Sequence, residues 1–228
     1  MKRRYGFCYY FREEDRNPEA SAMPDFEQIM ASPIAAYDEA LAFVGGHGML
    51  NKALLRIAAD LERHGIAYAV IGAVALNQHG YKRLTVDIDL LMTKEGLQTF
   101  RDQLVGLGYR PAFPGASKQF KTSEDNVLIE IITAGEYPGD GKPKSIVFPD
   151  PGEYSEDIAG VKTMTLPKLL ELKLASGMTG RGRLKDLADV QEMIKAKGLK
   201  EDFAENLDES VREKFREIHR DTAPEAGS

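Results

Sequence analysis

Two apolar stretches of this chain carry carboxylates in positions where strands rarely hold them. The first, "TVDIDLLM" (Thr85 to Met92), alternates as a strand does and places Asp87 and Asp89 two residues apart, although Asp is depleted in strands. The two-residue period of a strand puts both acids on one face, with Cβ atoms roughly 7 Å apart. The pattern indicates either acids aimed into a site or a half-exposed strand with an acidic polar face.

The second stretch, "NVLIEIITA" (126–134), surrounds Glu130 with apolar residues on both faces. Such a strand is typical of the centre of a sheet, where an unpaired charge is very costly. Glu130 therefore needs a cation or a hydrogen-bond partner. The alternative is a strand end at which Glu130 reaches solvent or an arginine.

Together, Asp87, Asp89 and Glu130 favour a divalent hard cation, Mg²⁺ or Mn²⁺. Magnesium takes oxygen ligands and is commonly shared with substrate phosphates. Two such ions about 4 Å apart can hold the attacking and leaving oxygens of a phosphoryl or nucleotidyl displacement. The three acids are therefore the predicted metal ligands.

Hydrophobic periodicity predicts a chain in which strands and helices alternate. A helix-prone segment from Asp25 to Val44 is broken at Pro33, and an amphipathic helix runs from Met49 until Gly65 stops it. Strands are expected at 67–72, 85–92 and 126–134, helices at 94–107, 166–175, 184–196 and 201–220, and a loop at 135–152 that can hold a short strand at 146–148.

Length and composition fit one domain with a small appendage. The chain has 228 residues, of which 43% are hydrophobic and 29% charged, with a net charge of −6. We expect an N-terminal extension of unclear structure (1–48), a main domain (49–200), a C-terminal helix (201–220) and a tail (221–228). The negative charge argues against a nucleic-acid surface over the whole chain. No window is apolar enough for a membrane span, and no apolar signal-peptide core follows the first residues, so we expect a cytoplasmic protein.

A glycine follows the first expected strand directly before a short helix. Gly72 lets the backbone approach a ligand closely, and the helix N-terminus offers N–H groups to phosphate. The alternative is a glycine that only makes the turn. The chain has neither the P-loop motif nor the G-x-G-x-x-G motif.

A lysine and an aspartate lie on the inner faces of later helices. Helical spacing places Lys173 on the same stripe as Leu169 and Leu170, so it either extends to solvent or meets an anion. Asp186 lies at the edge of the next inner stripe, within reach of Lys173, unless it is a solvated acid of the first helical turn. Lys185 and Asp189 are expected to point away.

These pieces, in this order, resemble the nucleotidyltransferase superfamily with the polymerase-beta-like fold, specifically its AbiEii toxin-type group. The resemblance covers roughly residues 49–196. It implies an α+β fold, a mixed β-sheet backed by helices, in which C-terminal helices complete the site. It is carried by "VIGAVALNQHGYKRLTVDIDLLM" (70–92), "VLIEIIT" (127–133) and "TLPKLLELKLASGMTGRGRLKDLADVQEMI" (165–194).

The resemblance implies a role for each matching residue. A glycine motif holds the triphosphate of an NTP, three acids bind Mg²⁺, and a lysine and an aspartate on the C-terminal helices complete the site. The implied residues are Gly72 and Ala73 for phosphate, Asp87, Asp89 and Glu130 for metal, Lys173 and Asp186 for the helical pair, and Arg83 and Thr85, which match R-x-T-x-D-x-D and can touch phosphate. Ala73 stands where the family has Gly or Ser, which removes one hydroxyl donor.

The implied function is an enzyme that transfers a nucleoside monophosphate from an NTP to an acceptor hydroxyl. The resemblance suggests a toxin of a toxin–antitoxin system, with RNA (tRNA ends) or a protein as acceptor and a cognate antitoxin as partner. Lys168, Arg181, Arg183 and Lys185 can form a local basic rim for RNA. The alternatives are a non-catalytic nucleotide-binding or interaction module and a nucleotidyltransferase acting on a small molecule such as an antibiotic.

Overall fold

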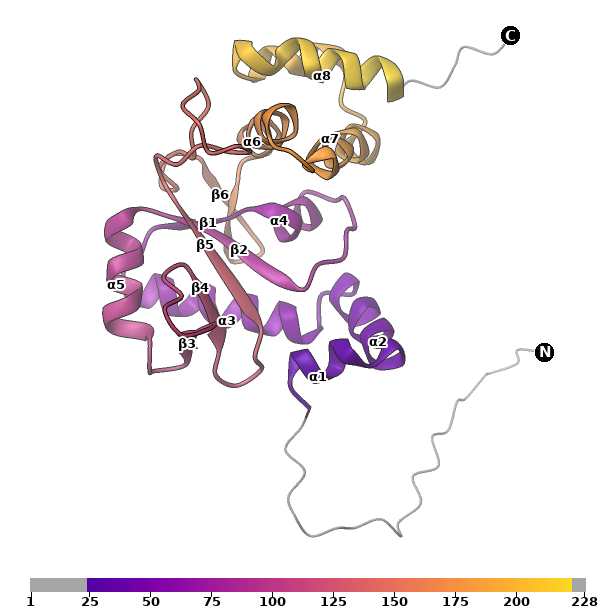
Figure 1. Cartoon of the computed structure of the whole chain (residues 1–228). Helices are drawn as coiled ribbons and strands as arrows, with labels where there is room; N and C mark the ends of the chain where they lie inside the picture. The colour runs from indigo at the N-terminus through magenta and orange to yellow at the C-terminus, as the bar shows by residue number, and fades with distance from the viewer. Residues whose placement is uncertain (1–23, 223–228) are drawn as a thin grey trace, which may run out of the picture.

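The structure, a computed structural model that describes residues 24–222, is built on a seven-stranded mixed sheet (Figure 1). The strand order is β3-β4-β5-β2-β1-β7-β6. The strands are β1 (Tyr68–Val70), β2 (Asp87–Met92), β3 (Tyr109–Pro111), β4 (Gln119–Thr122), β5 (Leu128–Thr133), β6 (Ser155–Ile158) and β7 (Val161–Met164).

Helices cover both sides of this sheet. In Figure 1, α6, α7 and α8 lie on one side, next to α4, while α1, α2 and α3 lie on the other. The helices are α1 (Phe26–Ala31), α2 (Pro33–Val44), α3 (Met49–Arg63), α4 (Gly72–Gln78), α5 (Lys94–Leu104), α6 (Leu166–Thr179), α7 (Leu184–Lys197) and α8 (Glu209–Thr222), with a 3₁₀ turn η1 (Glu201–Asn206). The predicted mixed sheet backed by helices is confirmed.

The three predicted strands occupy the centre of the sheet. β2 pairs with β5 in parallel and with β1 antiparallel, and the register sets Asp89 opposite Glu130. Ile88, Leu90 and Leu91 of β2 are fully buried, as expected for strands whose two faces are covered. The sheet therefore presents the acids of two neighbouring strands side by side.

The helices around the sheet follow the predicted periodicity. α3 buries a stripe that includes Leu50, Leu54 and Leu61 and contacts β2 and β7. Ser32 separates α1 from α2 and caps α2, whose first residue is Pro33, a position where proline costs no hydrogen bond. The C-terminal helices α6, α7 and α8 pack on one another.

Four outer strands of the sheet, two on each side of its centre, and one loop differ from the sequence prediction. β3, β4, β6 and β7 are three or four residues long, too short for a clear alternation. The expected strand at 146–148 is wrong: Phe148 alone exchanges backbone hydrogen bonds with Glu136 and Gly135, and a single residue does not make a strand.

The predicted domain boundaries stay predictions. Residues 24–48 of the predicted extension form α1 and α2, and Phe26 and Phe43 are buried in the core. Residues 1–23 and 223–228, which belong to the predicted extension and tail, lie outside the described residues. None of the described helices is both long and apolar enough to cross a bilayer.

Candidate active site

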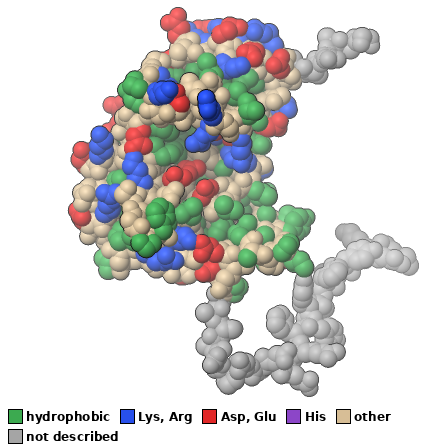
Figure 2. All heavy atoms as spheres, viewed as in Figure 1, with side chains coloured by type: hydrophobic (Ala, Val, Ile, Leu, Met, Phe, Trp, Pro, Cys, Tyr) green, Lys and Arg blue, Asp and Glu red, His purple; other side chains and the backbone are tan. Residues whose placement is uncertain are grey.

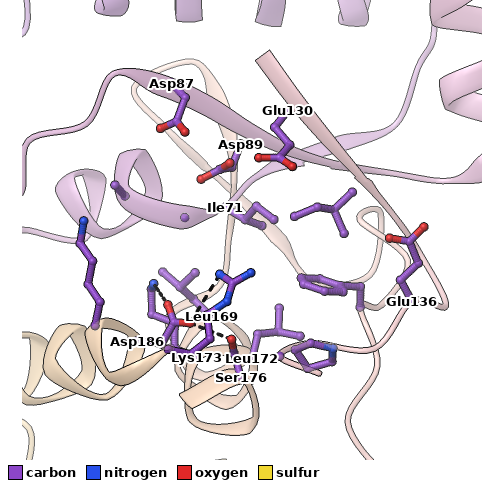
Figure 3. Close-up of a pocket in the computed structure, with 18 of the residues that line it drawn as sticks. Ile71, Asp87, Asp89, Glu130, Glu136, Leu169, Leu172, Lys173, Ser176 and Asp186 are labelled. Atoms are coloured by element: carbon purple, nitrogen blue, oxygen red, sulfur yellow. Dashed lines mark hydrogen bonds and ion pairs between the residues drawn. The ribbon is translucent and has the colours of Figure 1, made fainter. Parts of the chain in front are cut away.

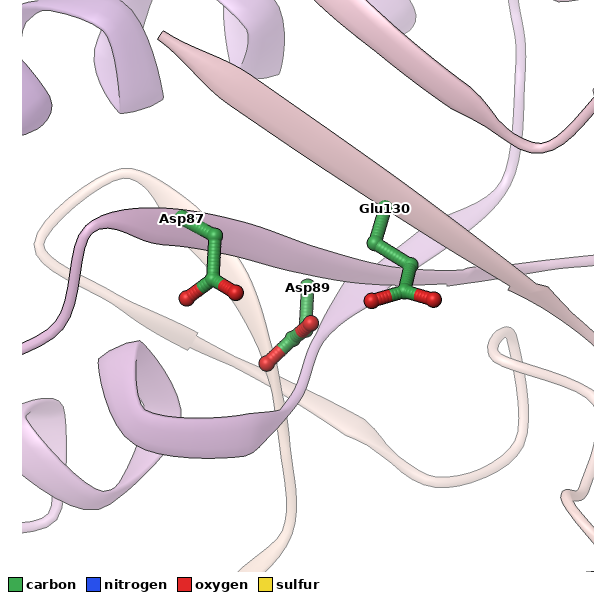
Figure 4. A group of neighbouring side chains, drawn as sticks. All are labelled: Asp87, Asp89 and Glu130. Carbon is green, nitrogen blue, oxygen red and sulfur yellow. The ribbon is translucent and has the colours of Figure 1, made fainter. Parts of the chain in front are cut away.

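Three carboxylates converge where β2 and β5 run side by side. Asp87 and Asp89 come from β2 and Glu130 from β5, and the parallel register brings Asp89 next to Glu130. Each residue offers one carboxylate oxygen, and these three oxygens lie within 4.8 Å of one another. Figure 4 shows the three side chains extending from the two neighbouring strands to the same side. The predicted metal ligands therefore form one cluster.

Neighbouring polar groups hold two of these carboxylates in place. The Thr85 hydroxyl donates to Asp87 Oδ1 at 2.5 Å, and Gln119 Nε2 on β4 lies 3.4 Å from Glu130 Oε1. Both donors are neutral, so they orient the acids without cancelling their charge. The cluster thus retains a negative charge that a bound cation can neutralise.

The pKa of Asp89 is raised by its place in this cluster. Burial and the nearby charges of Asp87 and Glu130 raise the pKa of this carboxyl, Lys173 and Arg83 lower it, and the net pKa is about 7. Like charges held close in a half-buried cluster favour the protonated form. A set of oxygen donors with excess negative charge fits Mg²⁺, a hard cation that prefers carboxylates.

The Asp89 carboxylate lies directly beside the backbone of Gly72. The residue has φ +63°, and a Cβ added there would lie 1.9 Å from Asp89 Oδ2. The backbone N–H of Ile71 donates to the Asp89 carbonyl at 3.0 Å, so the turn before α4 follows the β2 strand closely. The glycine is thus required both by the backbone conformation and by the position of the acid.

A buried group of charges from α6 and α7 lies across from the acids. Lys173 Nζ on α6 donates to Asp186 Oδ1 at 3.1 Å and to Asp189 Oδ2 at 2.7 Å. Ser176 Oγ donates to Asp186 Oδ2 at 2.7 Å. Figure 3 shows the three acids on one side of the cavity and Lys173, Ser176 and Asp186 on the other. The predicted contact between Lys173 and Asp186 is present.

Asp189 is the residue that sequence reasoning missed. The expectation that it points away is wrong: Asp189 is 2% exposed and also accepts from Arg83 Nη1 at 2.8 Å. Its carboxylate can stay buried because Arg83 and Lys173 both pair with it. The available signal was its position four residues before Met193, on the inner stripe of α7. Lys185, also expected to point away, lines the cavity.

Arg83 is fixed by α4 as well as by Asp189. The side chain of Asn77 donates to the Arg83 carbonyl and accepts from the Arg83 N–H at 3.2 Å. Within residues 24–222, Arg83 Nε is the buried side-chain nitrogen that has no hydrogen-bond partner. A buried donor without a partner is costly, so Arg83 has capacity for a further acceptor.

One cavity of about 600 Å³ unites these groups, a size typical of small-molecule sites. Figure 2 shows acidic side chains gathered in a central hollow, with basic side chains beyond them on the side of α6 and α7. All nine residues named from the sequence line the cavity: Gly72, Ala73, Arg83, Thr85, Asp87, Asp89, Glu130, Lys173 and Asp186. The loop at 135–152 adds Tyr137 and Phe148, which the sequence pattern did not single out.

No protein family and no curated protein matches the chain. The chain is similar in structure to TM1012 from Thermotoga maritima, a proposed nucleotidyltransferase (18% identity, 63% of this chain and 91% of that chain, TM-score 0.41). It is also similar to ANT(2'')-Ia in complex with adenylyl-2''-tobramycin (18% identity, 72% and 94%, TM-score 0.45), and to JHP933 from Helicobacter pylori (15% identity, 76% and 90%, TM-score 0.42). At these identities and TM-scores the similarity carries no argument about activity.

Proposed function

We propose that the protein is a metal-dependent nucleotidyltransferase that moves a nucleoside monophosphate from an NTP to an acceptor hydroxyl. The supporting observation is the geometry of the cavity. Three carboxylates with oxygens within 4.8 Å of one another lie on one side of the cavity, Lys173 lies across from them, and Arg83 also lines the cavity. An NTP with its divalent cation needs both an acidic metal-binding wall and a basic wall for its phosphates.

Asp87, Asp89 and Glu130 are the residues that would hold Mg²⁺ or Mn²⁺. When bound there, the ion supplies charge neutralisation at the phosphates and lowers the pKa of the acceptor hydroxyl. In the transfer, the acceptor oxygen bonds to the α-phosphorus, the bond from that phosphorus to the β-phosphate breaks, pyrophosphate leaves with the electron pair, and the hydroxyl proton goes to water.

The cations of the cavity provide the phosphate contacts in this proposal. Arg83 is held by Asp189 and Asn77 yet keeps Nε without a partner among the described residues, so the guanidinium is oriented before the nucleotide arrives. Lys173 is similarly held by Asp186 and Asp189. Preorganised cations stabilise developing negative charge without reorganisation. At the glycine turn, Ala73 offers no hydroxyl, so the backbone N–H groups are the donors there.

The finer parts of the family resemblance remain predictions. A toxin role, a cognate antitoxin and an RNA or protein acceptor are not tested by the geometry of this chain. Lys168, one member of the predicted basic rim, bonds to Glu171 and lies 4.6 Å from the ring centroid of Tyr154. Arg183 and Lys185 line the cavity itself, where they can serve the nucleotide as well as RNA.

The test is a transfer assay with each α-labelled NTP, Mg²⁺ and a set of acceptors that includes total tRNA, total protein and small hydroxyl compounds. We expect label transfer and pyrophosphate release that depend on Mg²⁺ and are lost in Asp89→Asn. The matched control is Asp102→Asn, an exposed acid on α5 that accepts a hydrogen bond from Gln98. Mg²⁺-dependent NTP binding without turnover on any acceptor would favour the binding module over the enzyme.

A further inference from the structure

A second cavity of about 610 Å³ adjoins the acid cluster. It lies between the helices α1 and α2 and the segment 83–87 that leads into β2. Its helical wall includes Phe26, Met30, Pro33, Ala36, Tyr37, Ala40 and Phe43, and its other wall includes Leu84 and Val86. We call this cavity the α2 groove.

The α2 groove and the candidate active site share part of their lining. Arg83, Thr85, Asp87 and Lys185 line both cavities, whereas Leu84 and Val86 line the groove alone. Asp87, a member of the acid cluster, therefore lies where the two cavities meet.

The walls of the groove present apolar side chains to solvent. Tyr37 is 65% exposed, Leu84 55% and Val86 49%, and the small side chains of Ala36 and Ala40 leave room between them. Figure 2 shows hydrophobic side chains gathered over this region, beside the central acidic side chains. A contiguous exposed apolar surface at the mouth of a site is typical of ligand binding.

The charge of the groove argues against a polyanionic ligand. The helices α1 (FEQIMA) and α2 (PIAAYDEALAFV) contain no basic residue, and the acids that line the groove are Glu39 and Asp87. The cations of the lining are Arg83, which already pairs with Asp189, and Lys185. RNA binding depends on basic side chains that follow the phosphates, and this groove does not supply them.

We propose that the α2 groove binds the acceptor, and that the acceptor is a small alcohol or phenol with a flat apolar body. The proposal rests on the function proposed above and names its second substrate. The anionic nucleotide occupies the cavity lined by Arg83 and Lys173, the apolar body lies between Tyr37 and Leu84, and the hydroxyl reaches past Thr85 toward Asp87. The bonds made and broken are those of the transfer described above.

The test uses 2-(2-naphthyl)ethanol as the probe, with the full-length protein, Mg²⁺ and NTP. Tyr37→Asp places a charge in the groove, and Ile34→Asp is the matched control, because Ile34 is 75% exposed on the same helix and is not among the groove-lining residues. We expect Tyr37→Asp to weaken probe binding, or raise the probe KM, at least tenfold. Ile34→Asp should leave it unchanged, and both variants should bind NTP as the unmodified protein does.

Two results would overturn the proposal. The first is that Tyr37→Asp and the unmodified protein bind the probe with equal affinity while both bind NTP normally. This result would leave the nucleotidyltransferase proposal intact. The other is label transfer to tRNA that Tyr37→Asp leaves unchanged, which would assign the acceptor to RNA. A chain that binds no NTP in calorimetry would instead show that the proposed function itself has failed, and the groove proposal with it.

Discussion

The Asp89 carboxylate lies in the space that a side chain at Gly72 would need. A Cβ at that position would come within 1.9 Å of Asp89 Oδ2 and 2.8 Å of Asp89 Cγ. The turn before α4 and the acid on β2 therefore fit only because residue 72 has no side chain. This relationship joins the proposed phosphate-binding turn to the proposed metal ligand and makes their geometry interdependent.

Gly72→Ala should displace Asp89 and weaken Mg²⁺-dependent NTP binding. The positive φ of Gly72 adds a backbone cost of about 1–3 kcal/mol for a residue with a Cβ. Gly65→Ala is the matched control, because Gly65 has φ +62° and nothing within 4 Å of an added Cβ. Both variants should lose stability in urea unfolding, and only Gly72→Ala should lose nucleotide affinity. Equal nucleotide affinity in the two variants would show that nucleotide binding does not depend on the fit between Gly72 and Asp89.

Removing the Asp189 carboxylate should destabilise the fold. Asp189→Ala leaves Arg83 and Lys173 with one carboxylate fewer in a buried setting, a change that typically costs about 3–5 kcal/mol. Glu192→Ala on the same helix is the control, since Glu192 pairs with Lys195 at 2.8 Å on the surface, where such a pair contributes about 0–1 kcal/mol. Urea unfolding of both variants measures the difference. Equal losses would show that Asp189 is not a buried anchor.

Mg²⁺ affinity should rise with pH and level off near neutrality. The metal-free protein holds the Asp89 pKa at about 7, against an ordinary value of 3.8, so Mg²⁺ must displace a proton below pH 7. Affinity should therefore change by up to about tenfold per pH unit below 7 and little above it. Calorimetric titrations from about pH 5.5 to about pH 8.5, a range that spans the pKa of Asp89, measure how Mg²⁺ affinity depends on pH. A flat profile would contradict the raised pKa.

The same pKa shift fixes how metal-free stability depends on pH. Because the folded-state pKa of Asp89 is raised, the native protein binds more protons than the unfolded chain between about 4 and 7. The contribution of Asp89 to stability is therefore full below its unfolded pKa and is lost as pH rises through 7. Asp89→Asn should remove this slope from thermal unfolding measured in EDTA.

The acid cluster could be predicted because its signals are local. Asp87 and Asp89 share a strand face by period alone, and Glu130 interrupts an apolar run, so each acid is conspicuous within its own segment. Periodicity does not predict the parallel register that sets Asp89 opposite Glu130, because this register depends on how two strands far apart in the sequence pair.

The residues that were missed depend on partners far away in the chain. Asp189 is buried because Arg83, 106 residues earlier, donates to it, and its neighbouring positions alone do not reveal that partner. The α2 groove depends on how α2 packs beside Leu84 and Val86. Helical periodicity predicts the two helices around Pro33 but not the surface that they form with another segment.

Thermal unfolding of the unmodified protein and Asp89→Asn, each with and without Mg²⁺ and NTP, is the decisive test of the metal site. Ligand that binds only the folded state stabilises it by about 2.7 kcal/mol at 100 times its Kd. Asp89→Asn removes a repelling charge from the cluster, so at pH 8 its metal-free Tm should equal or exceed that of the unmodified protein. We expect Mg²⁺ and NTP to raise the Tm of the unmodified protein and of Asp102→Asn, and to leave the Tm of Asp89→Asn unchanged. A Tm rise in Asp89→Asn equal to that of the unmodified protein would contradict the assignment of Asp87, Asp89 and Glu130 as the metal site.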